Sequence, residues 1–278
     1  MFSEEIPYMI EKTDALSPAE KRDNWYVSFG LQAVDGLKPS KYLVGLAEDH
    51  IAGDKTYAQV AASVEEYYSG EKSGANAGNE GNAGNEKEAD FVSLRIQELL
   101  SEKAFTFSPV ALKGIHKRLF TGILDPDIPV GEYRKYNITK GERVLSGNSV
   151  LYSSANMIAD TLYYDFENEK SYNYAGMTTA EIAYHAMDFV SGIWQIHPFA
   201  EGNTRTCAAF AIGYFSMLGF ALDNEPFKKH SGYFRDALVM NNCGINKNPV
   251  YLRMFADNLL LGGSHDLNFD IPVIVIDN

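Results

Sequence analysis

The segment HPFAEGNTR holds residue types that are well suited to chemistry on a phosphate. His197 can accept a proton near neutral pH, and Glu201 offers the hard oxygen ligands that Mg²⁺ prefers. Gly202 and Asn203 can donate N–H groups to developing negative charge, and Arg205 can clamp a phosphate through two parallel hydrogen bonds. These roles indicate phosphoryl or nucleotidyl transfer, in which positioning and charge stabilisation dominate.

Two helices are expected to position these residues. The helix before the segment should end near His197, because Pro198 cannot continue it. The helix after it should begin with Asn203 as its N-cap, and Gly202 lets the backbone turn between the two. The N-terminus of this second helix would offer free N–H groups to an anion, while Phe199 points into the core.

An ordinary capping loop is the structural alternative for this segment. Any lone histidine, glutamate or arginine would favour that alternative. Several specified residue types at fixed spacing favour the phosphate site instead.

The segment resembles the signature of the Fic family, HPF-x-[Asp/Glu]-Gly-Asn-x-Arg between two helices. GEYRK at residues 131–135 is similar to the family's Gly-x-Tyr/Phe-Arg segment, and HSGYFRDALVMNN and YLRMFADNLL resemble the last helices of a Fic branch that carries GNTRT. The resemblance covers roughly residues 91–261. It implies an all-α fold, a Fic-type helical bundle with a small β-hairpin flap.

The resemblance also implies an activity, protein adenylylation (AMPylation). AMP would pass from ATP, with Mg²⁺ or alternatively Mn²⁺, to a Ser, Thr or Tyr hydroxyl of an unidentified protein substrate, and auto-AMPylation is expected. His197 would deprotonate the hydroxyl, and Glu201 would hold the metal that bridges the α- and β-phosphates. The Asn203 side chain would contact the α-phosphate and Arg205 the β-phosphate region. The implied nucleotide- and phosphate-binding set is Gly202, Asn203, Thr204 and Arg205.

A flap is expected between GEYRK and the next helix. Two β-leaning runs, Tyr136–Thr139 and Arg143–Tyr152, surround the turn signals KG and GN. The resemblance implies that the flap holds the target's backbone as an added strand. The residues expected to dock the target are Val144, Leu145, Ser146, Gly147, Asn148, Ser149, Val150, Leu151 and Tyr152.

One position departs from the pattern of many Fic proteins, which carry a second arginine three residues after the first. Here that position is Ala208, and Thr204 replaces a glycine. Alanine cannot contact a γ-phosphate, so the grip on that phosphate must be weaker or come from elsewhere.

The N-terminal part resembles the small helical antitoxins that inhibit Fic toxins, which carry Ser/Thr-x-x-x-Glu-Gly. The corresponding residues here are Leu31, Asp35 and Gly36, a degenerate inhibitory motif. Because the acid is shortened and its partner arginine is replaced by Ala208, we expect weak or no inhibition through that salt bridge. The alternative is that Leu31 and Asp35 are core and cap residues of a docked helix.

The predicted domain plan has four parts: an N-terminal helical, antitoxin-like regulatory region (1–71), a flexible Gly/Asn-rich linker (72–90), a Fic domain (91–262) and a strand-like tail (263–278). Three short helices are expected in the first part, with Ser17, Ser40 and Thr56 as caps and Gly53 and Gly70 as stops. Helices expected in the Fic domain are Phe91–Lys103, Ser108–Thr121, Ser153–Asn168, Thr178–Ile196, Asn203–Leu218, Pro226–Asn241 and Pro249–Leu261.

Composition argues against two classes of partner, nucleic acids and membranes. A formal net charge of -13 argues against a broad nucleic-acid surface. The N-terminus lacks the features of a signal peptide, and no apolar run is long enough to span a membrane, so we expect a cytoplasmic protein without a membrane partner. The resemblance adds a bacterial, toxin–antitoxin-like setting and a homodimer as expectations.

Two other functions compete with adenylylation. One keeps the fold and transfers a different group, as the protein kinases of the Doc branch do, but those tend to carry Ala-Asn-Lys where this chain has GNT. The other is a pseudoenzyme that binds nucleotide or a partner protein without turnover. The intact His197 and Glu201 argue against it, and the alanine at position 208 keeps it open.

Overall fold

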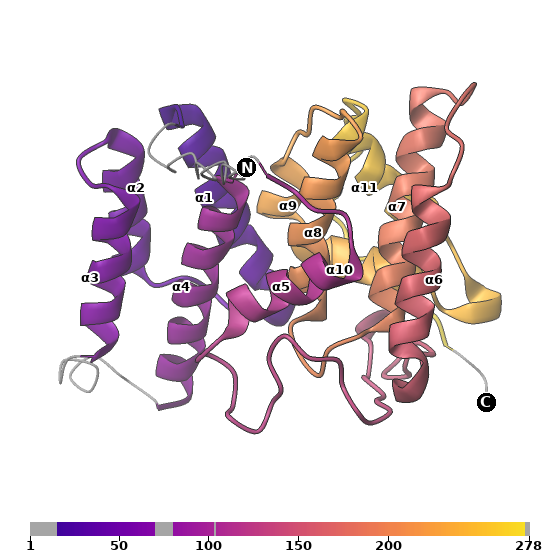
Figure 1. Ribbon diagram of the computed structural model, residues 1–278, viewed down its shortest axis with the longest axis horizontal. Coiled ribbons are helices and arrows are strands. Elements are labelled where there is room, and N and C mark those ends of the chain that lie inside the picture. Colours follow the sequence, from indigo (N-terminus) through magenta and orange to yellow (C-terminus); the bar gives the residue numbers. More distant parts are fainter. Residues whose placement is uncertain (1–15, 70–79, 103, 276–278) are drawn as a thin grey trace, which may run out of the picture.

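The computed structural model describes residues 16–69, 80–102 and 104–275. This part of the chain contains helices and loops and no β-strand, which confirms the all-α prediction. Figure 1 shows α2 and α3 at one end of the molecule and α6 and α7 at the other. The helices, with short 3-10 helices marked η, are α1 Pro18–Gln32, η2 Ala33–Asp35, α2 Lys41–Ala52, α3 Tyr57–Ser69, α4 Glu80–Leu100, α5 Pro109–Phe120, η4 Arg143–Leu145, η5 Ala155–Met157, α6 Ile158–Lys170, α7 Thr179–Ile196, α8 Asn203–Met217, α9 Glu225–Lys229, α10 Ser231–Asn241, η6 Gly244–Asn246 and α11 Val250–Leu260.

The three predicted N-terminal helices are confirmed as α1, α2 and α3. Ser17 caps α1 in a capping box, and the Ser40 hydroxyl accepts a hydrogen bond in the first turn of α2. Gly53 ends α2 in the left-handed conformation at φ 89°. Thr56 accepts a hydrogen bond from the N–H three residues on, whereas the predicted stop at Gly70 lies outside the described residues.

The predicted flexible linker is wrong over its second half, because α4 begins at Glu80. Asp90, at the end of that predicted linker, is fully buried and anchors this helix to the N-terminal part. Its carboxylate accepts hydrogen bonds from the Ser40 N–H and the Tyr68 hydroxyl, each at 2.7 Å. The earlier part of the predicted linker lies outside the described residues. A tertiary anchor, which composition does not reveal, therefore makes this polar stretch helical.

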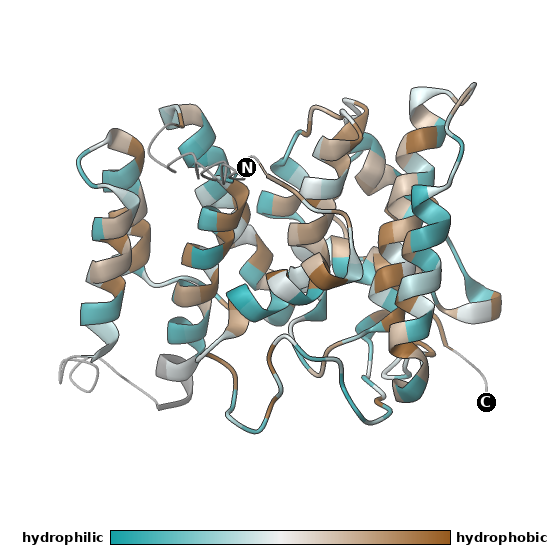
Figure 2. Ribbon diagram, viewed as in Figure 1, coloured by the Kyte–Doolittle hydropathy of each residue, from teal (hydrophilic) through white to brown (hydrophobic). Residues whose placement is uncertain are grey.

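The N-terminal helices and the rest of the chain share a hydrophobic core. Val27 and Leu31 of α1 are fully buried in the same cluster as Trp194 of α7 and Phe210 of α8. A second, smaller cluster around Trp25 of α1 joins α2, α3 and the second half of α4. Figure 2 shows apolar and hydrophilic segments alternating along α2 and α3, as expected for helices with one buried face. Leu31 is thus a core residue, as one of the two sequence interpretations proposed.

The helix predicted over 226–241 is divided in the structure into α9 and α10, with His230 between them. The cause is close packing against α1. A Cβ on Gly30 would lie 2.4 Å from the carbonyl oxygens of Phe227 and Lys228, so only a glycine lets the two backbones approach so closely. The Ser231 hydroxyl then donates a hydrogen bond to the Gly30 carbonyl.

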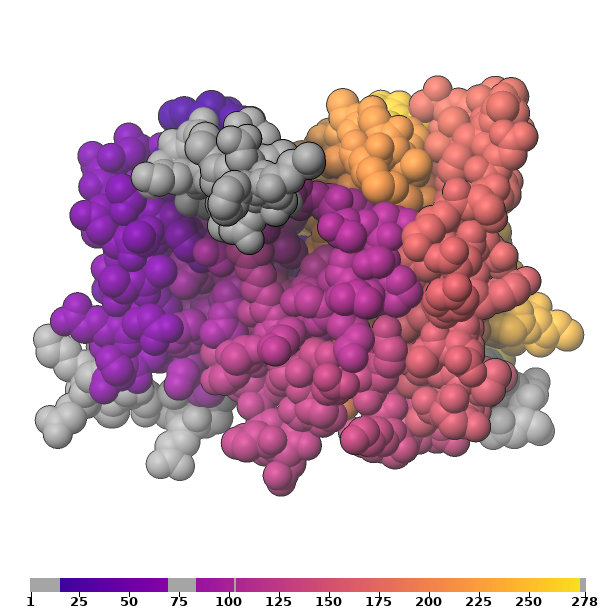
Figure 3. All heavy atoms as spheres, in the orientation of Figure 1, coloured from indigo at the N-terminus to yellow at the C-terminus, as the bar shows by residue number. Residues whose placement is uncertain are grey.

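The predicted β-hairpin flap is not a hairpin. Within this described loop, two backbone hydrogen bonds join its sides, from Glu142 N–H to Asn148 O and from Gly147 N–H to Glu142 O, and η4 fills the space between them. Val144 and Leu145 are both fully buried, which the alternating pattern of a half-exposed strand does not allow. The loop between α5 and α6 lies along the lower edge of the face shown in Figure 3.

The predicted strand-like tail has no strand in its described part, up to residue 275. It runs instead against the flap loop. The Ile274 N–H donates to the Val144 carbonyl at 2.8 Å, and the Ser146 hydroxyl donates to the Ile274 carbonyl at 3.1 Å. None of the described helices is long and apolar enough to cross a membrane.

The contact between α1 and α9 can be tested with two glycine substitutions. Gly30→Ala should lower the free energy of unfolding by about 2 kcal/mol or more, because its Cβ meets backbone atoms that cannot rotate away. Gly45→Ala, within α2, meets nothing within 4 Å and should raise it by about 0.5–1 kcal/mol. Urea unfolding curves measure both, and equal effects of the two substitutions would contradict the packing described.

Candidate active site

The end of α7 presents His197 in an uncommon backbone conformation. Its φ is +51°, in the left-handed region, and Pro198 follows it as the predicted helix terminator. The buried Arg134 fixes this end: its Nε donates to the His197 carbonyl at 2.8 Å, and its Nη1 donates to the Tyr136 carbonyl at 2.7 Å. Arg134 therefore ties the GEYRK segment to the end of α7.

The turn into α8 requires Gly202. Its φ is +72°, and a Cβ there would lie 2.4 Å from the ring of Phe120 in α5. Phe199, predicted to point into the core, is fully buried. The sequence prediction that Gly202 allows this turn is confirmed, and the close approach of Phe120 adds a second reason for glycine.

The side chain of His116 in α5 holds the loop between α7 and α8 in place. Its Nδ1 accepts a hydrogen bond from the Gly131 N–H, so its Nε2 carries the proton and donates to the Glu201 carbonyl at 3.0 Å. Its ring stacks on Phe199 with 3.9 Å between centroids. Burial lowers the pKa of His116 to about 4, so the ring is neutral and acts as a structural bridge.

Asn203 is the first residue of α8 rather than its predicted N-cap, which is Gly202. Its side chain closes the loop: Oδ1 accepts from the Phe199 N–H at 2.9 Å, and Nδ2 donates to the Phe199 carbonyl at 2.8 Å. The Thr204 hydroxyl accepts from the Trp194 indole at 3.0 Å. Both side chains are therefore bound by the protein itself. The backbone N–H groups at the start of α8 carry no side-chain cap and are available as donors.

The His197 imidazole is almost completely buried, at 4 % exposed. The Tyr152 ring covers it, with 4.2 Å between centroids, and Trp194 lies edge-on at 5.6 Å. Among the described residues, neither ring nitrogen has a hydrogen-bond partner. Burial, followed by the charge of Lys140, holds the pKa of His197 well below its ordinary value, so the ring is neutral at pH 7 and can accept a proton.

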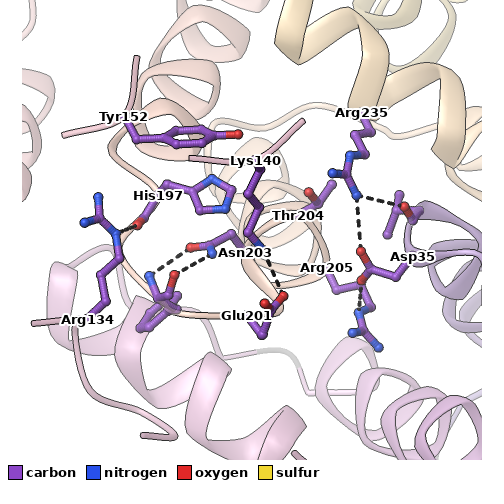
Figure 4. A network of polar contacts seen from close by, with 12 residues as sticks. Asp35, Arg134, Lys140, Tyr152, His197, Glu201, Asn203, Thr204, Arg205 and Arg235 are labelled. Atoms are coloured by element: carbon purple, nitrogen blue, oxygen red, sulfur yellow. Dashed lines mark hydrogen bonds and ion pairs between the residues drawn. The ribbon is translucent and has the colours of Figure 1, made fainter. Parts of the chain in front are cut away.

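Glu201 points outward at the start of α8, and its side chain is 51 % exposed. Lys140, on the loop before η4, forms an ion pair with it at 2.8 Å between Nζ and Oε2 (Figure 4). Among the described residues, no three acidic, histidine or cysteine side chains gather into a metal cluster. A single accessible carboxylate beside a helix N-terminus still fits Mg²⁺, which is commonly held by one or two carboxylates together with substrate phosphates.

Arg205 is buried, at 3 % exposed, and is already paired with acids. Its Nε lies 2.8 Å from Asp35 Oδ2, its Nη2 lies 2.6 Å from Glu88 Oε1, and its guanidinium lies over the Phe120 ring. The expectation that Asp35 lacks an arginine partner is therefore wrong. The missing arginine at position 208 does not leave the acid unpaired, because the first motif arginine takes that role.

A second arginine also reaches Asp35. Arg235 of α10 lies 3.4 Å from Asp35 Oδ1 through Nη1 and 3.3 Å from Glu142 Oε2 through Nη2. Glu142 in turn accepts a hydrogen bond from the Tyr152 hydroxyl at 3.0 Å. Polar contacts thus run from the ring that covers His197 to the acid that binds Arg205. Figure 4 shows His197 beside Tyr152 on one side of the site and the contacts of Asp35 with Arg205 and Arg235 on the other.

A cavity of about 690 Å³ lies beside this network. Val34, Glu142, Tyr233 and Arg235 are among its lining residues, whereas His197 is not. The cavity therefore reaches the network at Glu142 and Arg235 and stops short of the predicted base.

Sequence reasoning misses several residues of the site: Glu88, Arg134 as a helix anchor, Lys140 and Glu142. Glu88 lies in the stretch predicted to be a linker, and the sequence pattern assigns Lys140 to a turn. The ion-pair partners of Glu88, Lys140 and Glu142 lie more than 50 residues away along the chain, so no local spacing could pair them. Arg134 is the exception, because its segment resembles a family motif.

Comparison with known proteins identifies part of the chain. Residues 106–214 match the model of the Fic/DOC family. A search of curated protein sequences found no match. Among solved structures, the N-terminal Fic domain of a VirB-translocated Bep effector protein from Bartonella quintana has a TM-score of 0.50 at 19 % identity, covering 66 % of this chain and 86 % of that chain.

Two other solved structures are similar at the same identity, 19 %. BepC, a VirB-translocated effector from Bartonella tribocorum with bound AMPPNP, has a TM-score of 0.42 over 55 % of this chain and 74 % of that chain. BepA, a type IV secretion system effector, has a TM-score of 0.49 over 64 % and 62 %. The matching family model identifies residues 106–214 as a Fic/DOC domain, and the B. quintana Fic domain has a similar fold.

Proposed function

We propose that the protein is an adenylyltransferase that moves AMP from ATP to a hydroxyl group of a target protein. The observation that carries this proposal is His197: a neutral, buried imidazole whose two nitrogens have no partner among the described residues. It lies four residues before Glu201, at the uncapped start of α8. A base and an anion site so placed suit the deprotonation of a hydroxyl beside a phosphate.

The proposed step balances as follows. The target oxygen forms a bond to the α-phosphorus of ATP, and the hydroxyl proton passes to His197. The bond from the α-phosphorus to the bridging oxygen breaks, and pyrophosphate leaves with the bonding electrons. N–H groups at the start of α8 stabilise the negative charge on the α-phosphate.

Glu201 is the residue that would hold Mg²⁺ together with the phosphates. When bound, the ion neutralises negative charge on the reacting phosphates. The same carboxylate is paired with Lys140 in the structure, so metal binding requires that this ion pair opens.

The flap loop is our proposed docking site for the target, as the sequence resemblance implies. Leu151 projects from it at 86 % exposed, one residue before the tyrosine that covers His197. The target hydroxyl can reach the imidazole only if the Tyr152 ring moves.

We also propose that the N-terminal region restrains the enzyme through Arg205. Asp35 and Glu88 neutralise the guanidinium that would bind a phosphate. The same observation favours a second candidate function, a nucleotide-binding protein without turnover, if the restraint is permanent. The inhibition that we propose is stronger than the sequence suggests, because the acid has two arginine partners.

Labelled ATP separates the candidate reactions. Incubation with Mg²⁺ should transfer label from the α position and not from the γ position, to the protein itself or to a lysate target. His197→Ala should abolish the transfer, because it removes the proposed base. Transfer of γ label would indicate a kinase, and transfer of neither label would indicate the binding protein.

The pH dependence of the transfer should reflect the buried imidazole. Burial favours neutral His197, so the base form persists to lower pH than for an exposed histidine. We expect the rate to stay constant from pH 8 down through about 6.5, the ordinary pKa of histidine, and to fall only on further acidification. A profile of kcat/KM against pH measures this, and a midpoint above that ordinary value would contradict the assignment.

Substitution of Asp35 tests the proposed restraint. Deleting the N-terminal region would also remove Leu31 from the core, so a point change is the cleaner test. Asp35→Ala should raise the transfer rate about fivefold or more, because Arg205 and Arg235 lose a shared acid. Asp54→Ala, an exposed aspartate in the same region, is the matched control. An unchanged or lower rate for Asp35→Ala would rule out the restraint.

A further inference from the structure

We propose that Lys140 is a phosphate-binding residue of this site and contacts the transferred phosphate through its ammonium group. The inference rests on the proposed nucleotide chemistry and names a residue that the sequence motif does not contain. Lys140 also supplies a positive charge at a site where Ala208 replaces the second motif arginine.

The position of Lys140 is fixed by the loop that carries it. Its N–H donates to the Ser149 hydroxyl at 3.1 Å. The next residue, Gly141, is so close to the chain that a Cβ would lie 3.0 Å from the Gly147 carbonyl. The backbone is therefore held, and the long side chain crosses to the start of α8, where Nζ lies 2.8 Å from Glu201 Oε2 (Figure 4).

Lys140 differs from the other cations near His197 in what it contacts. Arg134 donates to four backbone carbonyls, Arg205 lies between two acids, and Arg235 lies between Asp35 and Glu142. Each of these three arginines is therefore held by at least two partners. Within the described part of the chain, the ammonium of Lys140 has a single acidic partner, Glu201.

The ion pair between Lys140 and Glu201 can be broken at little cost in stability. The Glu201 side chain is 51 % exposed, and ion pairs in contact with solvent contribute little to stability. The triphosphate of bound ATP carries more negative charge than one carboxylate, and its α-phosphate would lie at the same helix end. Glu201 would then be free to turn to Mg²⁺ while the ammonium turns to a phosphate oxygen.

The charge of Lys140 also acts on the predicted base. Among the positive charges that lower the pKa of His197 it has the largest effect, ahead of Arg134 and Arg235. Tyr152 covers the same imidazole, and its hydroxyl is bound by Glu142. The Lys140 ammonium thus lies near the proposed base His197, the proposed metal ligand Glu201 and the start of α8. A group that stabilises the transferred phosphate must lie in such a position.

Three variants of the full chain test the proposal. Lys140→Met removes the charge and keeps the length of the side chain, Lys140→Arg keeps the charge, and Lys135→Met removes an exposed lysine five residues earlier as the control. We would measure MgATP binding by calorimetry, kcat and KM for AMP transfer, and the Mg²⁺ concentration that gives half the maximal rate. Melting temperatures verify that each variant is folded.

Lys140→Met should lower kcat/KM on the order of 100-fold at saturating Mg²⁺, with Lys140→Arg recovering most of it and Lys135→Met unchanged. An unchanged kcat/KM for Lys140→Met would overturn the proposal. So would an effect that disappears at high Mg²⁺, since Lys140 would then act only by orienting Glu201. If the unmodified chain transfers no AMP, the proposed function fails, and calorimetry still decides: weaker MgATP binding by Lys140→Met supports the phosphate contact, and equal binding rejects it.

Discussion

A buried guanidinium group needs partners for its charge and its N–H groups, and at Arg205 these partners are two acids from the N-terminal part of the chain. The side chain is 3 % exposed, and its two acids come from η2 and α4, far from it in sequence. The N-terminal helices must therefore stay docked for the active-site helix to keep a buried charge. The shared hydrophobic core has the same effect, because Leu31 packs in the same cluster as residues of α7 and α8. The stability of the fold and the proposed restraint on Arg205 thus depend on the same contacts.

The contacts beyond Asp35 extend the proposed restraint to the tyrosine ring that covers His197. Asp35 binds Arg235, Arg235 binds Glu142, and Glu142 accepts the hydroxyl of the ring that covers His197. The proposed base His197 and the proposed phosphate ligand Arg205 are therefore both covered or bound by residues of one network. Displacement of Asp35 by a phosphate would leave Arg205 paired with Glu88 alone and Arg235 paired with Glu142 alone. The two arginines are coupled because they share Asp35, and this coupling requires no movement of α8.

Local chemistry makes much of this structure predictable. The caps of α1 and α2, the break after α7 and the turn at Gly202 follow from rules that act within a few residues. The spacing of the motif alone also predicts that His197, Glu201 and Arg205 gather at one helix end. What could not be predicted depends on tertiary contacts. Asp90 makes a polar stretch helical, Gly30 divides the helix over 226–241, and Asp35 and Lys140 find partners that are remote in sequence.

The left-handed backbone of His197 has a consequence for how this site could lose the proposed activity. Asparagine adopts that conformation more readily than most residues do, and its side chain is also polar and smaller than histidine. A single exchange of His197 for asparagine would therefore remove the base with little strain in the loop. Gly202 offers no such route, because any larger residue meets Phe120. Within this architecture, a descendant that only binds nucleotide could arise at the base in one step, while the glycine beside it would remain fixed.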